Sequence, residues 1–79
     1  MKLPVIKKMV ESFSDAQLEA AELALLEETQ PEIEVEGADE GEKLTHVMAA
    51  RFILNEMSKG LDYNTSLRAY TSKVRTSIS

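Results

Sequence analysis

The stretch from Val47 to Leu54 contains a single polar residue, Arg51. On a helix, this composition places apolar side chains almost all round the axis, and a helix of that kind lies in the middle of a fold. A chain of 79 residues can barely supply one hydrophobic core. We therefore predict a single helical domain over residues 1–79 that packs around a central helix at about Glu42–Lys59.

The N-terminal segment predicts a short amphipathic helix. Its apolar residues share helical spacing, and they are Ile6, Met9, Val10 and Phe13. Pro4 suits the first turn of such a helix, where a missing backbone N–H costs nothing. Ser14 and Gln17 then form the S-x-x-Q pattern of a capping box, so a second helix is expected to begin at about Asp15.

The second helix is expected to end at about Thr29, because Pro31 disfavours helical backbone in the residue before it. Its apolar residues do not form one stripe. One side is formed by Leu18, Ala21 and Leu25. Leu23 and Leu26 lie well round from that side, and a surface helix of a monomer needs only one apolar face. Either this helix is enclosed within the bundle, or its second side meets another chain.

Residues 30–41 interrupt the helical pattern with Pro31, Gly37 and Gly41, and they include five acidic residues and no basic one. Ile33 and Val35 alternate with glutamates, as in a strand. A five-residue strand without a partner is not stable by itself. We predict an extended loop that Ile33 and Val35 pin to the core.

A fourth helix is predicted at the C-terminal end. Gly60 lets the chain leave the third helix through left-handed backbone, and Asp62 or Asn64 is expected to cap the next one. Five residues form one narrow apolar stripe: Tyr63, Leu67, Tyr70, Val74 and Ile78. Its basic residues lie outside the stripe, and they are Arg68, Lys73 and Arg75. The predicted fold is all-α, a compact bundle of about four helices built from antiparallel αα-hairpins.

The formal charge of −5 hides a polarised distribution. Residues 11–42 carry twelve of the fourteen acidic residues, whereas all nine Lys and Arg lie outside this range. One interpretation is that acidic and basic helix faces neighbour one another within the bundle. The other is that the acidic segment, above all residues 27–42, binds a basic partner or the basic stripe of a second copy. Net acidity also argues against electrostatically driven binding of nucleic acid.

Few residues suggest chemistry. The only histidine, His46, follows Glu42 at Glu-x-x-x-His spacing, which differs from the Glu-x-x-His of carboxylate-bridged metal sites, so we expect a solvent-facing or locally paired histidine. Arg51 is expected to form an ion pair with a glutamate of the second helix or with a partner chain, or else to be exposed. Without cysteine or a nucleophile–base pair, the chain is expected to have no catalytic residue, no cofactor and no enzymatic activity.

Residues 60–68 resemble the turn and the start of the recognition helix in helix-turn-helix repressors, in which glycine opens the turn and Thr and Arg approach DNA. The resemblance implies a small nucleic-acid-binding regulator as an alternative function. Glu56 departs from the small residue of that family, and Ser66 departs from its buried apolar residue. Leu67 is expected to be buried in place of Ser66, which turns the helix by about 100°.

Short motifs along the chain also resemble a small uncharacterised family of bacterial proteins of about 80 residues. They are residues 2–6 (Lys-Leu-Pro-Val-Ile), 33–37 (Ile-Glu-Val-Glu-Gly), 60–61 (Gly-Leu), 69–70 (Ala-Tyr), 73–74 (Lys-Val) and 77–78 (Ser-Ile). The resemblance implies an all-helical fold and supplies no activity and no site.

The leading functional hypothesis is a non-enzymatic, acidic helical module for protein–protein interaction, or an accessory subunit, that forms a homodimer. The candidate interface residues are Leu23, Leu26, Arg51, Tyr63 and Tyr70. The partner is expected to be a protein or a second copy of the chain, with nucleic acid and membranes disfavoured. No stretch has the length of a membrane span or the pattern of a signal peptide, so a cytoplasmic location is expected.

Overall fold

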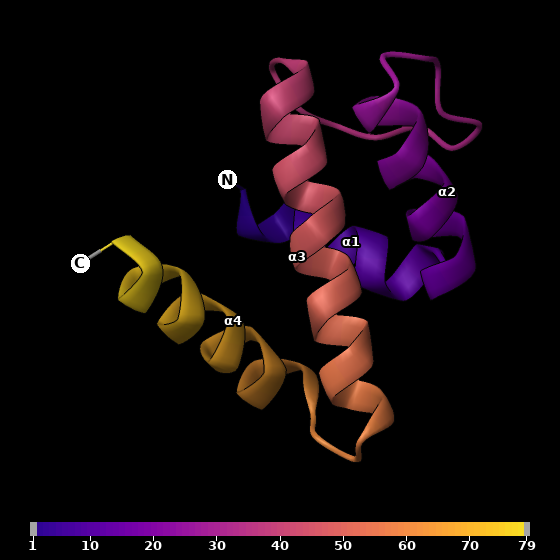
Figure 1. The fold of residues 1–79 in the computed structure, drawn as a ribbon. Coiled ribbons are helices and arrows are strands. Elements are labelled where there is room, and N and C mark those ends of the chain that lie inside the picture. Colours follow the sequence, from indigo (N-terminus) through magenta and orange to yellow (C-terminus); the bar gives the residue numbers. More distant parts are fainter. Residues whose placement is uncertain (1, 79) are drawn as a thin grey trace.

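Four helices build the fold (Figure 1): α1 (Leu3–Ser12), α2 (Asp15–Leu26), α3 (Glu40–Ser58) and α4 (Tyr63–Ile78). The computed structural model describes the backbone of residues 2–78 and the side chains of residues 2–75. Over these residues no strand occurs, and α3 packs against each of the other three helices. The prediction of an all-α bundle with the third helix at its centre is confirmed.

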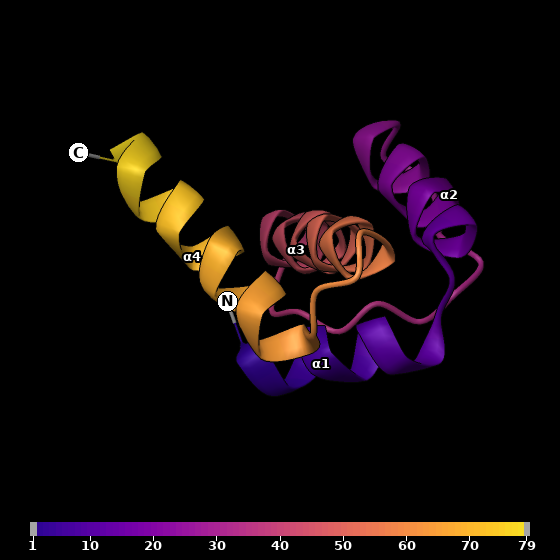
Figure 2. The same ribbon diagram turned by 90° about the horizontal axis from the view of Figure 1, so that it is seen from below.

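The other helices surround α3 on three sides. Figure 2 looks nearly along α3 and shows α1 crossing on one side of it, with α2 and α4 on the two flanks. α2 and α3 run in opposite directions, whereas α4 diverges from α3 towards its C-terminal end in both views (Figures 1 and 2). The fourth side of α3, opposite α1, faces outward between α2 and α4.

The core lies where α1, α2 and the loop before α3 meet α3. Its buried members are Ile6, Met9, Val10, Leu18, Ala21, Leu25, Val35, Val47, Ala49, Ala50 and Ile53. Ala49 and Ala50 are fully buried, and their small side chains let neighbouring backbones approach α3 closely. Val35 holds the loop to this core and Ile33 packs against it, so the prediction of a loop pinned by these two residues is confirmed.

The corner between α1 and α2 has the predicted capping box. The Ser14 hydroxyl accepts a hydrogen bond from the Gln17 backbone N–H, and Gln17 Oε1 accepts one from the Ser14 N–H at 2.9 Å. Pro4 lies in the first turn of α1, as predicted. These local bonds satisfy backbone N–H groups at the start of α2 that have no partner within the helix.

The predicted end of α2 at Thr29 is wrong, because the helix ends at Leu26. Glu28 has a φ of 60°, which is left-handed backbone. The Glu28 N–H then donates to the Leu25 carbonyl and the Thr29 N–H to the Ala24 carbonyl, the two bonds of a Schellman motif. The helix therefore closes three residues before the predicted end, without the glycine that usually marks this turn.

Replacing Glu28 with glycine is expected to raise the free energy of unfolding by about 0.5–1 kcal/mol, measured by urea denaturation. Glycine adopts left-handed backbone without the steric cost that a Cβ atom imposes, and this gain exceeds its larger entropy loss on folding. The matched control is Glu27→Gly, since Glu27 has an ordinary φ of −87°. A Glu27→Gly variant as stable as Glu28→Gly would contradict the prediction.

The N-terminus of α3 lies two residues earlier than the predicted Glu42. The helix begins at Glu40, because the Asp39 carboxylate caps it by accepting a hydrogen bond from the Glu42 N–H at 2.7 Å. Glu42 in turn accepts a bond from the Ala38 N–H, which lowers the pKa of its carboxyl. At the other end, Gly60 has a φ of 101°, which confirms the predicted left-handed residue after α3.

Asp62 caps α4, so the first of the two predicted caps is confirmed and Asn64 lies within the helix. The Asp62 carboxylate accepts a hydrogen bond from the Thr65 N–H at 2.7 Å. This bond holds the pKa of Asp62 below its usual value. The turn from α3 to α4 is thus fixed by Gly60 and by the Asp62 cap.

Candidate functional site

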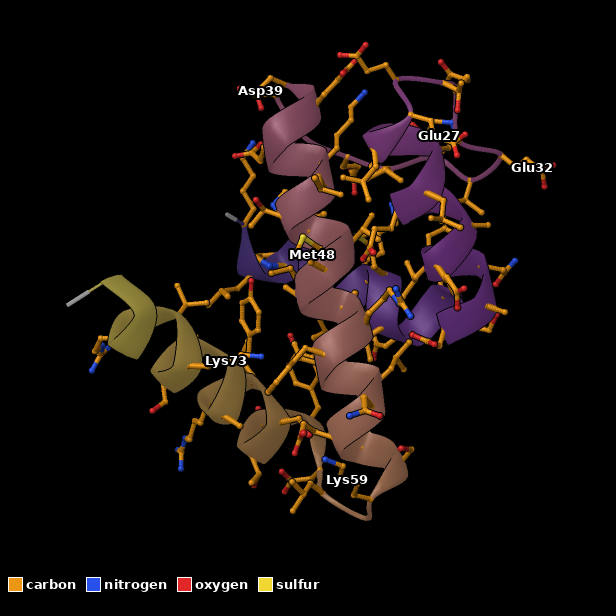
Figure 3. All side chains as sticks on the ribbon, viewed as in Figure 1. Glu27, Glu32, Asp39, Met48, Lys59 and Lys73 are labelled. Carbon is orange, nitrogen blue, oxygen red and sulfur yellow. The ribbon has the colours of Figure 1, made fainter. Side chains whose placement is uncertain are left out.

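The side of α2 that faces away from the core exposes two leucines. Leu23 is 51% exposed and Leu26 is 58% exposed, so neither is enclosed within the bundle. On α3, Met48 is 51% exposed, and it lies on the side of the helix that faces the viewer (Figure 3). We call Leu23, Leu26 and Met48 together the open face.

An ion pair joins the sides of α2 and α3 that carry Leu26 and Met48. Arg51 Nη1 lies 3.3 Å from a Glu22 carboxylate oxygen, which joins α3 to α2. Leu26 is one turn after Glu22, and Met48 is one turn before Arg51. Because the two helices run in opposite directions, these two steps lead the same way from the ion pair. Leu26 and Met48 therefore adjoin it on the same side.

Arg51 contacts three carboxylates of α2. Besides Glu22, its Nε donates to Asp15 Oδ1 at 3.1 Å and its Nη2 lies 3.6 Å from a Glu19 oxygen. The three acids follow one stripe of α2, and the Asp15 hydrogen bond raises the pKa of Arg51 above its ordinary value. The predicted ion pair between Arg51 and a glutamate of the second helix is confirmed. Part of the acidic segment is thus neutralised within the chain.

Replacing Arg51 with glutamine is expected to lower the free energy of unfolding by about 1 kcal/mol, because three neighbouring carboxylates would lose their shared cation. The loss should shrink in 1 M NaCl, since salt screens the repulsion between the carboxylates. Lys59→Gln is the matched control, because Lys59 is exposed and, within the described residues, its ammonium pairs with the single carboxylate of Glu56 at 3.2 Å. Equal effects of the two substitutions at low salt would contradict the prediction.

The apolar stripe of α4 is only partly covered. The Tyr70 ring packs against Phe52 of α3 with centroids 5.5 Å apart, and Tyr63 lies beneath Lys7, whose Nζ is 5.9 Å from its ring centroid. Tyr63, Leu67, Tyr70 and Val74 are all half-buried, and the side chain of Ile78 lies outside the described residues. The two candidate interface tyrosines therefore already pack against the core of their own chain, with part of each ring exposed.

The burial of Ser66 shows that the expected rotation of α4 is wrong. It is fully buried, and its hydroxyl donates to the Asp62 carbonyl at 2.7 Å, whereas Leu67 is only half-buried. The expectation that Leu67 is buried in place of Ser66 is therefore wrong. A serine can occupy this inward position because its hydroxyl finds an acceptor in Asp62, the residue that caps its helix.

His46 is neither solvent-facing nor paired within its own helix, so that expectation is wrong. It is fully buried, its Nε2 accepts a hydrogen bond from the Lys2 N–H at 2.9 Å, and its Nδ1 lies 2.8 Å from the Glu36 carbonyl. A backbone N–H only donates and a carbonyl only accepts, so these partners assign the neutral ring with its proton on Nδ1. Across the described residues, no group of three His, Asp or Glu side chains could hold a metal ion.

The loop before α3 borders a hollow of about 500 Å³. Lys2 and Lys43 line it together with Glu34, Glu36 and Gln30, so its wall carries charges of both signs. Among the side chains that the structure describes, no buried nitrogen or oxygen lacks a hydrogen-bond partner. None of the four helices, over their described residues, combines the length and the apolarity needed to cross a bilayer.

The sequence pattern identifies Leu23 and Leu26 as candidate interface residues but does not identify Met48. The third helix is predicted to be apolar almost all round, although Gly41 and Asn55, seven residues to either side of Met48, share its side of the helix. That spacing marks a solvent-facing side and could have identified Met48. No local signal pointed to the His46 bonds, because Lys2 and Glu36 are distant in the sequence.

A family model described as a family of unknown function (DUF6952) matches residues 1–79, the full length of this sequence. No curated protein and no solved structure matches the chain. The predicted resemblance to a small uncharacterised family is confirmed.

Proposed function

We propose that this chain, which belongs to the family of unknown function DUF6952, is a non-enzymatic helical interaction module that associates with a second copy of itself. The observation that carries the proposal is the exposure of Leu23 and Leu26 on the outer side of α2, while the opposite side of that helix is core. Met48 adds to the same surface. Grouped apolar side chains of this kind, rimmed by charged residues, are typical of protein interaction sites.

The size of the chain supports the proposal. A stable interface buries about 800 Å² of each partner. The surface of the chain is 5270 Å², so such an interface would cover roughly 15% of it. In Figure 2, α2 flanks the uncovered side of α3, so both helices are placed to contribute to such an interface. We likewise propose that the protein is bacterial and cytoplasmic and acts as a homodimer or accessory subunit.

Sedimentation equilibrium at 1–100 µM tests self-association (roughly the range of weak to moderate protein complexes). The wild-type chain is expected to form dimers, and the double variant Leu23→Glu/Leu26→Glu is expected to be a folded monomer, as judged by circular dichroism. Two charges in the contact would be buried without partners. Leu3→Glu/Leu61→Glu is the charge-matched control, because Leu3 and Leu61 are exposed leucines outside α2.

The control variant should keep the dimer. A wild-type chain that is monomeric throughout the concentration range would refute self-association. A Leu23→Glu/Leu26→Glu variant that still dimerises like wild type would place the contact elsewhere on the molecule. Loss of folding in this variant, with the control folded, would mean that the two leucines stabilise the single chain.

The alternative function is a small regulator that binds nucleic acid through α4, and one observation favours it. Ser66 faces inward, so α4 has the rotation that the helix-turn-helix resemblance requires, and Arg68 and Arg75 are exposed on it. Net acidity opposes it. A gel-shift assay at low salt tests the alternative: no shift of duplex DNA at 100 µM protein (about the weak limit of non-specific binding) would rule it out.

A further inference from the structure

α4 carries an apolar stripe that its own chain only half covers. Phe52 shields Tyr70, but Val74 lies beyond this contact and is not packed against the core, since α4 diverges from α3 there. Arg68 and Arg75 are exposed seven residues apart, which places them along one border of this stripe. The second half of α4 therefore presents the half-buried Val74 and part of the Tyr70 ring beside a basic rim.

α2 presents the opposite charge beside its own exposed apolar residues. Glu19 lies on the same side of the helix as Leu23 and Leu26, and Glu27 follows Leu23 by one turn. Both glutamates are exposed, and residues 11–42 contain no Lys or Arg. Within the described residues, Arg51 of the same chain contacts Glu19 as well as Asp15 and Glu22, whereas Glu27 lies outside this ion-pair cluster. The outer side of α2 is thus an apolar strip with an acidic rim.

Charge decides which helix of a second copy fits the open face. Two α2 helices side by side would bring acidic rims together, and two α4 helices would bring basic rims together. Pairing α2 with α4 of another chain matches acidic to basic and apolar to apolar. Like-charge contacts in an interface cost several kcal/mol, so this difference is sufficient to select the pairing.

We infer that α4 of a second copy covers the open face, with its apolar stripe on Leu23 and Leu26 and its arginines beside Glu19 and Glu27. The inference rests on the proposed self-association and names its contact. Each chain contains one α2 and one α4, which flank α3 on opposite sides. In a dimer with a two-fold axis, the same α2–α4 contact occurs twice and closes the assembly.

Reciprocal charge reversal tests the pairing. One variant carries Glu19→Lys and Glu27→Lys on α2, and the other carries Arg68→Glu and Arg75→Glu on α4. In a homodimer of either variant, both α2–α4 contacts join like charges. In the mixed dimer, one contact is wild type and the other has both signs reversed, so both contacts are complementary again.

Each variant alone is expected to dimerise at least about tenfold more weakly than wild type, and an equimolar mixture should restore dimers with nearly wild-type affinity by sedimentation. Folding of each variant is checked by circular dichroism. If the α4 variant dimerises like wild type while Leu23→Glu/Leu26→Glu is monomeric, self-association stands but α4 is not the partner. Failure of the mixture to dimerise also overturns the inference. A monomeric wild-type chain overturns both proposals.

Discussion

Replacing His46 with alanine is expected to lower the free energy of unfolding by about 3–5 kcal/mol. The substitution leaves a cavity in the core and removes the acceptor of the Lys2 N–H together with the donor to the Glu36 carbonyl. A chain of this length has a total stability of about 4–12 kcal/mol, so the substitution should remove a large part of it. Urea denaturation of the variant and of wild type measures the difference.

The matched variant is His46→Asn, which keeps an N–H donor near the position of Nδ1. It should keep the bond to the Glu36 carbonyl and lose the bond from the Lys2 N–H, and it should be about 1 kcal/mol more stable than His46→Ala. This variant keeps the prediction measurable if His46→Ala does not fold. A loss below 1 kcal/mol in His46→Ala would show that the imidazole does not join α1, the loop and α3.

Replacing Ile53 with alanine is expected to cost about 2–5 kcal/mol, again measured by urea denaturation. Ile53 is fully buried on the central helix, so its truncation leaves a cavity among side chains of several elements. Met48 lies on the uncovered side of the same helix and is the matched control. Met48→Ala should cost less than about 1 kcal/mol at a concentration at which the chain is monomeric.

The comparison between these two variants tests which side of α3 is the core. Similar losses for Ile53→Ala and Met48→Ala would contradict the arrangement in which α1, α2 and α4 leave one side of α3 uncovered. Repeating Met48→Ala at 100 µM adds a second readout. If a second copy covers the open face, Met48→Ala should then cost more than it does in the dilute sample, because dimerisation adds to apparent stability.

The sequence predicted those parts of the fold that depend on local chemistry. Ser14 and Gln17 lie three residues apart, and their side chains form the capping box of α2 without help from distant residues. Gly60 permits left-handed backbone after α3 whatever the tertiary packing around it. The Arg51 ion pair was also predictable, because a cation within an apolar stretch needs a carboxylate and the second helix is rich in them.

The sequence did not predict features that depend on distant residues or on unusual backbone. The side chain of His46 bonds to Lys2 and Glu36, which only the packing of α1 and the loop brings to it. The end of α2 depends on the left-handed backbone of Glu28, and the sequence has no glycine there to indicate this conformation. In the candidate site, the periodicity of α2 identified Leu23 and Leu26, but Met48 was not identified because the third helix is apolar almost all round in sequence.

The direct test of the central claim is an intermolecular paramagnetic relaxation experiment. The chain has no cysteine, so Ser72→Cys places a single spin label on α4, at an exposed position on the side opposite the apolar stripe. Labelled, unenriched chain is mixed with unlabelled chain enriched in ¹⁵N, so that broadening reports contacts between copies alone. The account predicts broadening of the amide signals of α2 around Leu23 and Leu26. No broadening, or broadening confined to α1, would contradict it.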